Sequence, residues 1–251
     1  MTEAPDMVDN DALELLTRRL VSNAALNSAE RAAVSALMRE VECFEAGACI
    51  VQHGAPCRRA WVLLEGFAYG QIGSRHSRRQ IVGFYLAGDL LDLHGALTGL
   101  SSEAVIAATD CKIATLDAEA LVSLIEAKPN LGRAFWIETL VEASIAREWI
   151  MNVGQRNARQ RLAHLCCEMA WRSREAGLGD GRTFSMPITH EQLGDATGLT
   201  SLHVNHTLRK LEAQDLIVQD GHAIRIIDEA RLRAEGDFEE LYLCRSAPRS
   251  M

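Results

Sequence analysis

The chain has 251 residues, 48% of them hydrophobic, which is enough for one large or two modest domains with a substantial core. No apolar run approaches the roughly 18 residues of a membrane-spanning helix, and the polar, acidic residues 1–10 do not resemble a signal peptide. A net charge of −8 excludes a protein that binds nucleic acid only by neutralising phosphates. Seven cysteines without a repeating spacing are typical of a reducing compartment, so we expect a cytoplasmic protein.

The N-terminal half is predicted to be a helical segment followed by short strands. Two amphipathic helices are expected within residues 11–40, and Asn27 and Glu30 form a capping box for the second, at 28–40. From Val41, β-rich runs alternate with glycines. The predicted strands are 49–53, 60–64, 67–72, 80–86, 104–107 and 111–117. Such spacing favours a compact β-roll of about 80 residues, within a first domain at 11–128.

A long helix is predicted next. Pro129 can start it, and nothing interrupts it until about Val153, so its limits are 129–154. Hydrophobic residues repeat along it at spacings of three and four. They are Ile137, Leu140, Val141 and Ile145. A helix that is apolar on more than one side needs a partner, either the core of its own chain or a parallel copy in a second chain.

Residues 189–211 have the spacing of a helix-turn-helix. Thr189 can N-cap a short helix, with Gln192 closing a capping box. Gly194 allows a close helix crossing, and Gly198 supplies the positive φ of the turn. The second helix, at 201–213, begins after the capping residue Thr200 or Ser201. Its buried stripe is predicted to be Val204, Leu208 and Leu211.

The opposite face of this second helix carries side chains suited to the DNA major groove. Asn205 can pair with adenine, His206 can donate to guanine N7, and Leu202 can meet a thymine methyl. Ser201 completes the predicted base contacts. The predicted phosphate contacts are Thr189, Thr200 and Arg209.

A hairpin follows the second helix. Two β-branched runs, 216–218 and 223–227, flank an Asp-Gly turn, and a short strand at 183–187 could pair with them. With a first helix at 158–173, this predicts a winged-helix DNA-binding domain at 155–227. Its net charge is +1, whereas residues 1–154 carry −7. A final helix at 228–243 and a loose tail complete the segment 228–251.

The order of these elements resembles the Crp/Fnr family of bacterial transcription regulators. The resemblance covers residues 30–227 and rests on the helix-turn-helix and on Gly47-x-x-Ile50-x-x-x-Gly54, Gly66 and Ala87-Gly88-Asp89. It implies an α+β fold with a cyclic-nucleotide-binding-like β-roll, a long dimerisation helix and a C-terminal winged helix. It also implies a homodimer on a two-fold symmetric promoter, pairing through Ile137, Leu140, Val141 and Ile145, with RNA polymerase as a further partner.

The chain departs from the cyclic-nucleotide-binding members of the family. Those members hold the cyclic phosphate with a glutamate and, about ten residues later, an Arg-Ser pair. The matching positions are Leu93, Glu103 and Ala104. A carboxylate repels a phosphate where a guanidinium would bind it. We therefore predict that the roll binds no cyclic nucleotide, and we expect no cofactor.

Other functions remain as alternatives. The cysteines Cys43, Cys49, Cys57 and Cys111 could hold an iron–sulfur cluster, although strand cysteines usually pack as small hydrophobes. His94 could ligate haem, or bond to Asp92 or backbone. Because the family's usual base-reading arginine is missing, a protein-interaction regulator without DNA binding is a third possibility. The basic run 75–79 is expected to be a solvated hairpin tip. No nucleophile–base pair, phosphate-binding glycine loop or metal-ligand spacing indicates an enzyme.

Overall fold

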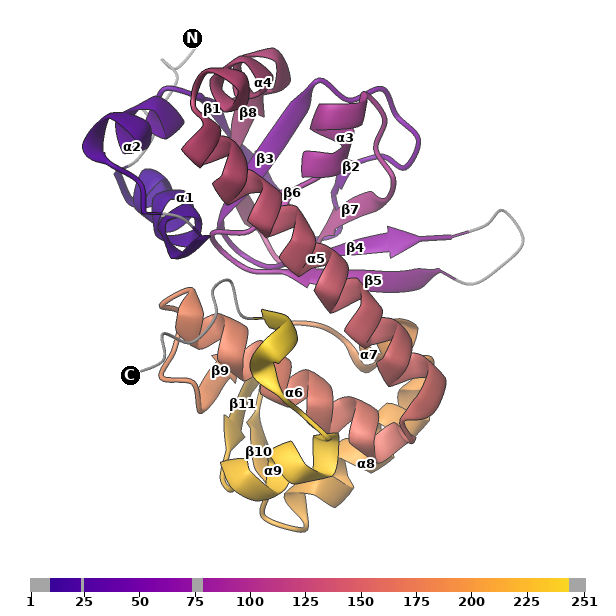
Figure 1. Ribbon diagram of the computed structural model, residues 1–251. Coiled ribbons are helices and arrows are strands. Elements are labelled where there is room, and N and C mark those ends of the chain that lie inside the picture. The colour runs from indigo at the N-terminus through magenta and orange to yellow at the C-terminus, as the bar shows by residue number, and fades with distance from the viewer. Residues whose placement is uncertain (1–9, 24, 74–78, 244–251) are drawn as a thin grey trace, which may run out of the picture. The chain divides into compact units, whose positions relative to one another are not determined.

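The computed structural model describes residues 10–23, 25–73 and 79–243, which divide into two compact units (Figure 1). The first unit contains the chain up to Gln71 and Phe84–Glu142. The second contains Ile72–Gly83 and Ala143–Leu243. The predicted α+β class is confirmed: a roll of strands, a long helix and a winged helix-turn-helix follow one another along the chain. The predicted basic hairpin tip falls mostly on residues 74–78, and the predicted tail on 244–251, outside the described residues.

Two four-stranded antiparallel sheets and several helices form a β-roll, which belongs to the first unit except for Ile72 at the end of its fourth strand and residues 80–83 at the start of its fifth. One sheet has the order β1-β8-β3-β6 and the other the order β2-β7-β4-β5. The strands are β1 (Met38–Phe44), β2 (Cys49–Val51), β3 (Arg59–Glu65), β4 (Ala68–Ile72), β5 (Gln80–Tyr85), β6 (Leu90–Leu91), β7 (Ala104–Ala107) and β8 (Cys111–Asp117). The helices are α1 (Asn10–Asn23), α2 (Ser28–Ser35), α3 (Leu93–Thr98), α4 (Ala118–Ala127) and the first half of α5 (Pro129–Gln155).

The side chains of β3 point alternately to the two faces of its sheet, and this gives the unit a core of two layers. Leu63 points into the cluster between the sheets, whereas its neighbours Val62 and Leu64 point into the cluster formed with the helices. Successive side chains of a strand face opposite sides of its sheet, so both faces of this sheet are buried. Leu20 of α1 and Phe135 of α5 complete the helical cluster, which fixes α5 against the roll.

The N-terminal helices differ in length from the prediction. The capping box is confirmed, because Asn27 accepts a hydrogen bond from the Glu30 amide at 2.9 Å and Glu30 accepts one from the Asn27 amide at 2.8 Å. However, α2 ends at Ser35, and β1 begins at Met38 within the predicted helix at 28–40. Strand β1 pairs with β8, which lies far along the chain, as in the pair Met38 and Leu116. This non-local pairing overrides the local helical pattern.

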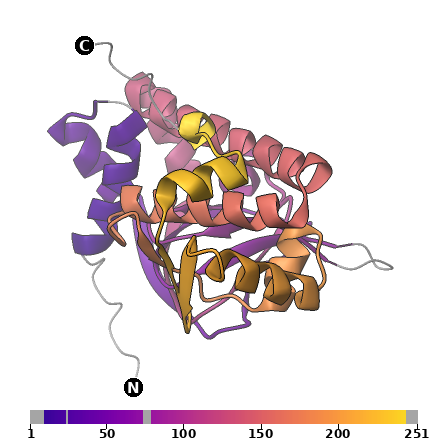
Figure 2. The ribbon, with the colours of Figure 1, turned by 90° about the horizontal axis from the view of Figure 1, so that it is seen from below.

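The second unit contains the second half of α5, five further helices and a three-stranded sheet among the described residues. They are α6 (Ala158–Glu175), β9 (Thr183–Ser185), α7 (His190–Thr197), α8 (Ser201–Glu212), β10 (Ile217–Asp220), β11 (Ala223–Ile226), α9 (Glu229–Gly236) and the 3₁₀ helix η1 (Glu240–Leu243). Figure 2 shows α9 lying beside α6. No described helix is both long and apolar enough to cross a membrane.

The predicted final helix at 228–243 is broken in two. Asp237 adopts a left-handed conformation, with a φ of 48°, and ends α9. Gly236 lies so close to α6 that an added Cβ would stand 2.5 Å from the His164 amide nitrogen. The close approach therefore requires glycine, and the chain turns there to bring Phe238 and Tyr242 against the His164 ring.

A buried carboxylate joins three elements of the second unit. Glu168 of α6 is fully buried and accepts hydrogen bonds from Trp149 Nε1 of α5 at 3.1 and 3.2 Å. It also accepts one from the Tyr242 hydroxyl of η1 at 2.9 Å, and it pairs with Arg172 at 3.4 Å. Burial and the Glu168 charge raise the pKa of Tyr242, which keeps its hydroxyl as a donor. The network ties the end of α5 to the first helix of the winged domain.

Candidate nucleic-acid interface

Helices α7 and α8 form the predicted helix-turn-helix. The Thr189 side chain accepts a hydrogen bond from the Gln192 amide at 3.1 Å, and Gln192 accepts one from the Thr189 amide at 2.7 Å. Gly198 adopts the left-handed conformation with a φ of 68°. A Cβ on Gly194 would lie 2.5 Å from the Leu199 carbonyl oxygen, so only glycine permits this crossing. The sequence therefore specifies both ends of the turn.

Helix α8 presents one face to its own domain and the other to solvent. Its buried residues are Val204, Thr207, Leu208 and Leu211. Leu202 is 79% exposed, Ser201, His206 and Arg209 are exposed, and Asn205 is half-buried. On a helical wheel, Leu202, His206 and Arg209 lie at the centre of the exposed face. The structure thus places the predicted base and phosphate contacts of α8 together on one accessible surface.

The predicted phosphate contacts Thr189 and Thr200 are the N-cap residues of α7 and α8. Each side-chain oxygen accepts a hydrogen bond from a backbone amide of its helix, and both residues are exposed. A hydroxyl that accepts in this way still has its own proton to donate. Both can therefore donate to a phosphate at a helix N-terminus, where anions are favoured.

The predicted wing is present. Strands β10 and β11 pair across the turn at Gly221, which has a φ of 58°, and β9 pairs with β11 as its third strand. Ile217, Ile224 and Phe184 are buried beneath it, which anchors the wing to the helices. A three-stranded wing next to an exposed helix is the arrangement in which strands and helix can both contact a duplex.

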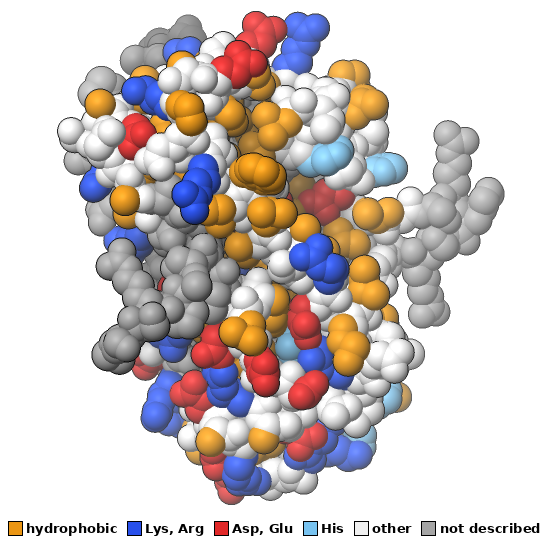
Figure 3. Space-filling model, viewed as in Figure 1, with side chains coloured by type: hydrophobic (Ala, Val, Ile, Leu, Met, Phe, Trp, Pro, Cys, Tyr) orange, Lys and Arg blue, Asp and Glu red, His pale blue; other side chains and the backbone are white. Residues whose placement is uncertain are grey.

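The long helix is apolar on more than one side, as the sequence indicated, and the structure separates a buried stripe from an exposed one. Val141 is buried within its own chain, and Ile137 and Ile145 are half-buried, whereas Leu140 is 53% exposed. Val141, at 7% exposure, has little further area to bury against a second copy, whereas Leu140 has much more, and pairing through the predicted set stays a prediction. The exposed stripe consists of Trp136, Leu140, Ala143, Arg147 and Ile150, at spacings of three and four. Figure 3 shows hydrophobic side chains on the face along which α5 runs.

The set of predicted site residues left out Trp136 and Ile150, which widen the apolar band of the helix and are 67% and 71% exposed. Counting in steps of three and four from Leu140 reaches both, so a heptad count would have found them. The set also left out His203 and Lys210, which are exposed on one flank of α8. Their positions relative to the buried stripe were visible in the sequence.

The roll residues at the phosphate-binding positions do not fit a cyclic nucleotide. Leu93 is buried, and Glu103 accepts a hydrogen bond from the Tyr85 hydroxyl. Burial raises the pKa of the Glu103 carboxyl, and no cation pairs with it within the described residues. Asp92 N-caps α3 from a left-handed conformation, and its carboxylate accepts from the Gly95 amide at 3.0 Å. The chain's own carboxylate thus occupies the anion-favouring end of α3.

Titration with cyclic AMP or cyclic GMP is accordingly expected to release no heat. The physical reason is the carboxyl of Glu103 where a phosphate needs a cation. Thermal melting gives a second measurement. A nucleotide that binds and is present at about a thousand times its dissociation constant would stabilise the folded chain by about 4 kcal/mol. A micromolar dissociation constant, or a clear rise in melting temperature with either nucleotide, would overturn this assignment.

The structure does not gather the four cysteines and His94 into a metal-binding cluster of the described residues. Cys43 and Cys49 are exposed, Cys57 and Cys111 are buried, and no group of three or more His, Cys, Asp or Glu with metal-binding geometry occurs in the described ranges. The His94 ring lies 3.4 Å from the Thr98 hydroxyl, while Asp92 bonds to Gly95 and Ser101 instead.

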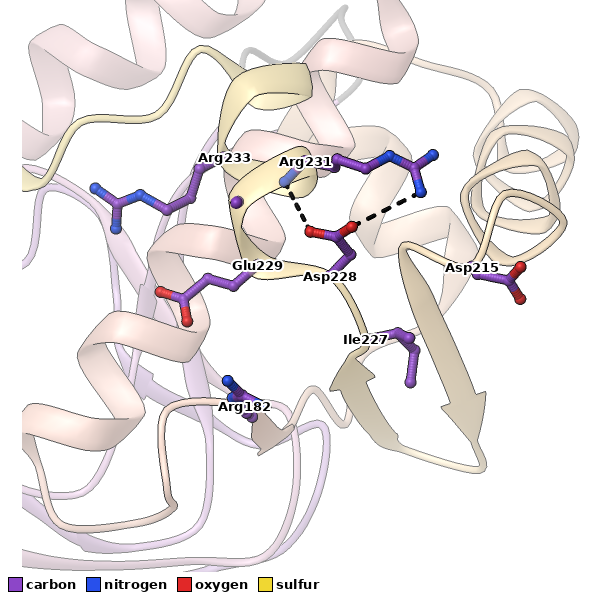
Figure 4. A pocket seen from close by; sticks show the side chains of 8 residues that line it. Arg182, Asp215, Ile227, Asp228, Glu229, Arg231 and Arg233 are labelled. Atoms are coloured by element: carbon purple, nitrogen blue, oxygen red, sulfur yellow. Dashed lines mark hydrogen bonds and ion pairs between the residues drawn. The ribbon is translucent and has the colours of Figure 1, made fainter.

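A separate hollow of about 670 Å³ lies on the second unit (Figure 4). It is lined mainly by Arg182, Ile227 and the start of α9. Arg231 pairs with Asp228 at 3.8 Å, and Arg233 pairs with Glu240. Two of the three arginines that line the hollow are thus matched within the chain, which makes it a weaker candidate for nucleic acid than the exposed face of α8.

The comparisons with known proteins agree with this geometry. Residues 160–235 match the Crp-like helix-turn-helix domain, and residues 41–128 match the cyclic nucleotide-binding domain. The transcriptional activatory protein AadR of Rhodopseudomonas palustris is 31% identical over 174 residues, 68% of this chain and 71% of AadR. The nitrogen fixation regulation protein FixK of Bradyrhizobium diazoefficiens is 34% identical over 161 residues, 62% of this chain and 65% of FixK.

Solved structures show the same fold. The structure of FixK2 from Bradyrhizobium japonicum has a TM-score of 0.71 at 23% identity and covers 78% of this chain and 96% of FixK2. A CooA mutant from Carboxydothermus hydrogenoformans has a TM-score of 0.66 at 13% identity, over 92% and 97% of the two chains. With the roll, the long helix and the winged helix-turn-helix all in place, the chain belongs to the Crp/Fnr family of DNA-binding transcription regulators.

Proposed function

We propose that the chain is a homodimeric regulator that reads a two-fold symmetric promoter site with α8. The observation that carries this proposal is the exposed face of α8, where Leu202, His206 and Arg209 are free of intramolecular ion pairs and side-chain hydrogen bonds within the described residues. Side chains that are exposed and without partners in the chain are available to base edges and phosphates.

The proposal assigns a role to each part of the chain. Residues 11–128 form the sensor or effector domain, 129–154 the dimerisation helix, 155–227 the DNA-binding domain and 228–251 a C-terminal helix and tail. The exposed stripe of α5 is apolar apart from Arg147, and it supports pairing with a second copy because an apolar heptad stripe is the seam of a parallel coiled coil. The family resemblance supports RNA polymerase as the further partner, a cytoplasmic location and a role without catalysis.

Substitutions on α8 test which residues read bases. Asn205→Ala or His206→Ala is expected to relax the preference at particular positions of the site, with a loss of about 1–3 kcal/mol there. Arg209→Ala is expected to weaken binding to all sequences alike and to reduce the salt slope by about one, because a phosphate contact carries no sequence information. Selection from a random DNA pool with each variant measures this.

The control is Glu175→Ala, which removes an exposed side chain at the end of α6. It should select the same motif as the unmodified chain with the same salt slope. Identical motifs for the unmodified chain, Asn205→Ala and His206→Ala would show that the reading face is wrongly assigned. Failure of the unmodified chain to select any motif would refute sequence-specific binding itself.

A further inference from the structure

At high pH, where histidine is neutral, the segment that would face DNA carries a net negative charge and would repel a polyanion. Residues 186–222, which contain α7, α8 and the wing turn, carry two cationic and five acidic side chains. Their formal net charge is therefore −3 when histidine is neutral. The same segment holds four of the eight histidines of the chain. With all four protonated its net charge becomes +1, so histidine decides the sign.

These histidines are His190, His203, His206 and His222, and we call them the histidine surface. His203 and His206 are exposed on α8, one turn apart. His190 is the first residue of α7, and His222 is exposed in the wing turn beside Gly221. The recognition helix, the N-terminus of the preceding helix and the wing turn are the parts of a winged helix-turn-helix that approach a duplex.

The groups around α8 leave His203 and His206 available. In the described part of the chain neither imidazole has an ion pair or side-chain hydrogen bond. The helix itself supplies Arg209, Lys210 and Glu212 as charged neighbours. The elements packed against α8 carry the other charged groups and histidines: His190, Glu191 and Asp195 on α7, Asp220 on β10, and Arg159, Arg161, His164, Glu168, Arg172, Arg174 and Glu175 on α6.

Several of these neighbouring charges have partners of their own. Arg79 pairs with Asp195 at 2.5 Å and with Glu191 at 3.9 Å. Arg161 donates to the Thr197 carbonyl oxygen at 2.8 Å, and Arg159 pairs with Glu235 at 2.8 Å. No carboxylate of the chain is therefore bonded to His203 or His206 within the described residues, and an incoming phosphate would meet no competitor at either ring.

We propose that His203 and His206, flanked by His190 and His222, are cationic DNA contacts, so that DNA binding takes up protons. This inference rests on the proposed function. It adds His203, which is not among the predicted base contacts, to the residues that touch DNA. Imidazole titrates near pH 6.5 in water, and a nearby phosphate favours its charged form. Binding therefore raises the protonated fraction at neutral pH, and by linkage acid strengthens binding.

The sign and size of the effect follow directly. Affinity is highest at low pH, falls as pH rises through the titration of the bound histidines, and is flat above it. A histidine whose pKa is higher by one in the complex than in the free chain strengthens binding by at most about tenfold. Each dimer would hold two copies of the histidine surface, so we expect the affinity to rise at least about tenfold from about pH 8 to about pH 6.

The experiment measures binding of the full chain to a labelled duplex that carries the motif recovered from a random DNA pool. Fluorescence anisotropy gives the dissociation constant at several pH and salt values. The slope of log K against log salt should be steeper at low pH by about 0.9 for each added charge. Burial, with nearby Arg156, lowers the pKa of His164, so the folded unit loses stability below about pH 6.5. The lowest pH used is the lowest at which the circular dichroism spectrum is native.

The variant His203→Gln/His206→Gln should lose most of the pH dependence and most of the change in salt slope. The matched control is His53→Gln, an exposed histidine in the first unit, which should keep both. A flat pH profile of the unmodified chain, or an unchanged profile in the double variant, overturns the proposal. Specific binding with a flat profile leaves the proposed function intact, whereas no binding at any pH refutes both.

Discussion

Replacing Leu140 and Ile150 by glutamate is expected to convert the protein to monomers and to weaken binding to a two-fold symmetric site by about 100-fold or more. These side chains are 53% and 71% exposed on one stripe of α5. In a paired helix each glutamate would be desolvated opposite its copy, so the two chains would repel. A monomer engages one half-site and loses the effective concentration that links the two, which is worth roughly 10²–10⁴ in affinity.

Sedimentation equilibrium measures the mass, and anisotropy on the same samples measures DNA binding. Leu241→Glu is the matched control, because Leu241 is 70% exposed but belongs to η1 and not to the stripe of α5. It should leave both mass and affinity unchanged. If the double variant remains a dimer, the interface lies elsewhere on the chain. If it is monomeric yet binds as tightly as before, the two half-sites are not read together.

Replacing Glu168 by alanine should lower the free energy of unfolding of the second unit by about 3–5 kcal/mol. The substitution leaves the Trp149 indole and the Tyr242 hydroxyl buried without their acceptor, and it leaves Arg172 without its partner. Denaturant unfolding followed by circular dichroism measures the loss. Because Trp149 lies at the end of α5, the same variant should also loosen the connection between that helix and α6.

Two further variants make this result interpretable. Glu175→Ala removes an exposed carboxylate from the end of the same helix and should cost at most about 0.5 kcal/mol. Glu168→Gln keeps one acceptor oxygen, so its loss of stability should fall between those of Glu168→Ala and Glu175→Ala. A loss at Glu168→Ala no larger than that at Glu175→Ala would show that the three donors find other partners or water, and that the network does not stabilise the unit.

The elements that the sequence predicted best are those with local signals. The capping residues Asn27 and Thr189 begin helices as expected, and Gly198 takes the positive φ of the turn. Each depends on contacts within four residues, which a sequence displays directly. The strand at 104–107 and the wing hairpin were likewise recognisable from β-branched runs beside turn residues.

The missed features depend on residues far apart in the chain. Strand β1 exists because it pairs with β8, and α9 ends at Gly236 because that glycine approaches His164. Similarly, Arg19 of α1 pairs with Asp89 and Glu138, a partly buried ion network that no local pattern indicates. For the Gly236–Asp237 break, however, the Gly-Asp pair was a usable stop signal.

The candidate site also divides into features with local signals in the sequence and features that depend on the fold. Helical periodicity located the exposed face of α8, because a single amphipathic helix has one buried stripe. It did not separate the two stripes of α5. That helix packs against its own chain through Val141 and exposes Leu140 on the other side, and adjacent residues of equal hydrophobicity cannot be assigned to a side without the fold.

The carboxylates of Asp92 and Glu103 in the roll bear on how such a regulator would be controlled. If the roll binds no cyclic nucleotide, as its carboxylates predict, there is no nucleotide occupancy to vary. Two variables remain in the proposed scheme: the pH, which acts through the histidine surface, and the amount of the protein. A chain that must pair before it binds would occupy its promoter in proportion to the square of its concentration below the dimer dissociation constant. Modest changes in synthesis or degradation would then act as an input signal.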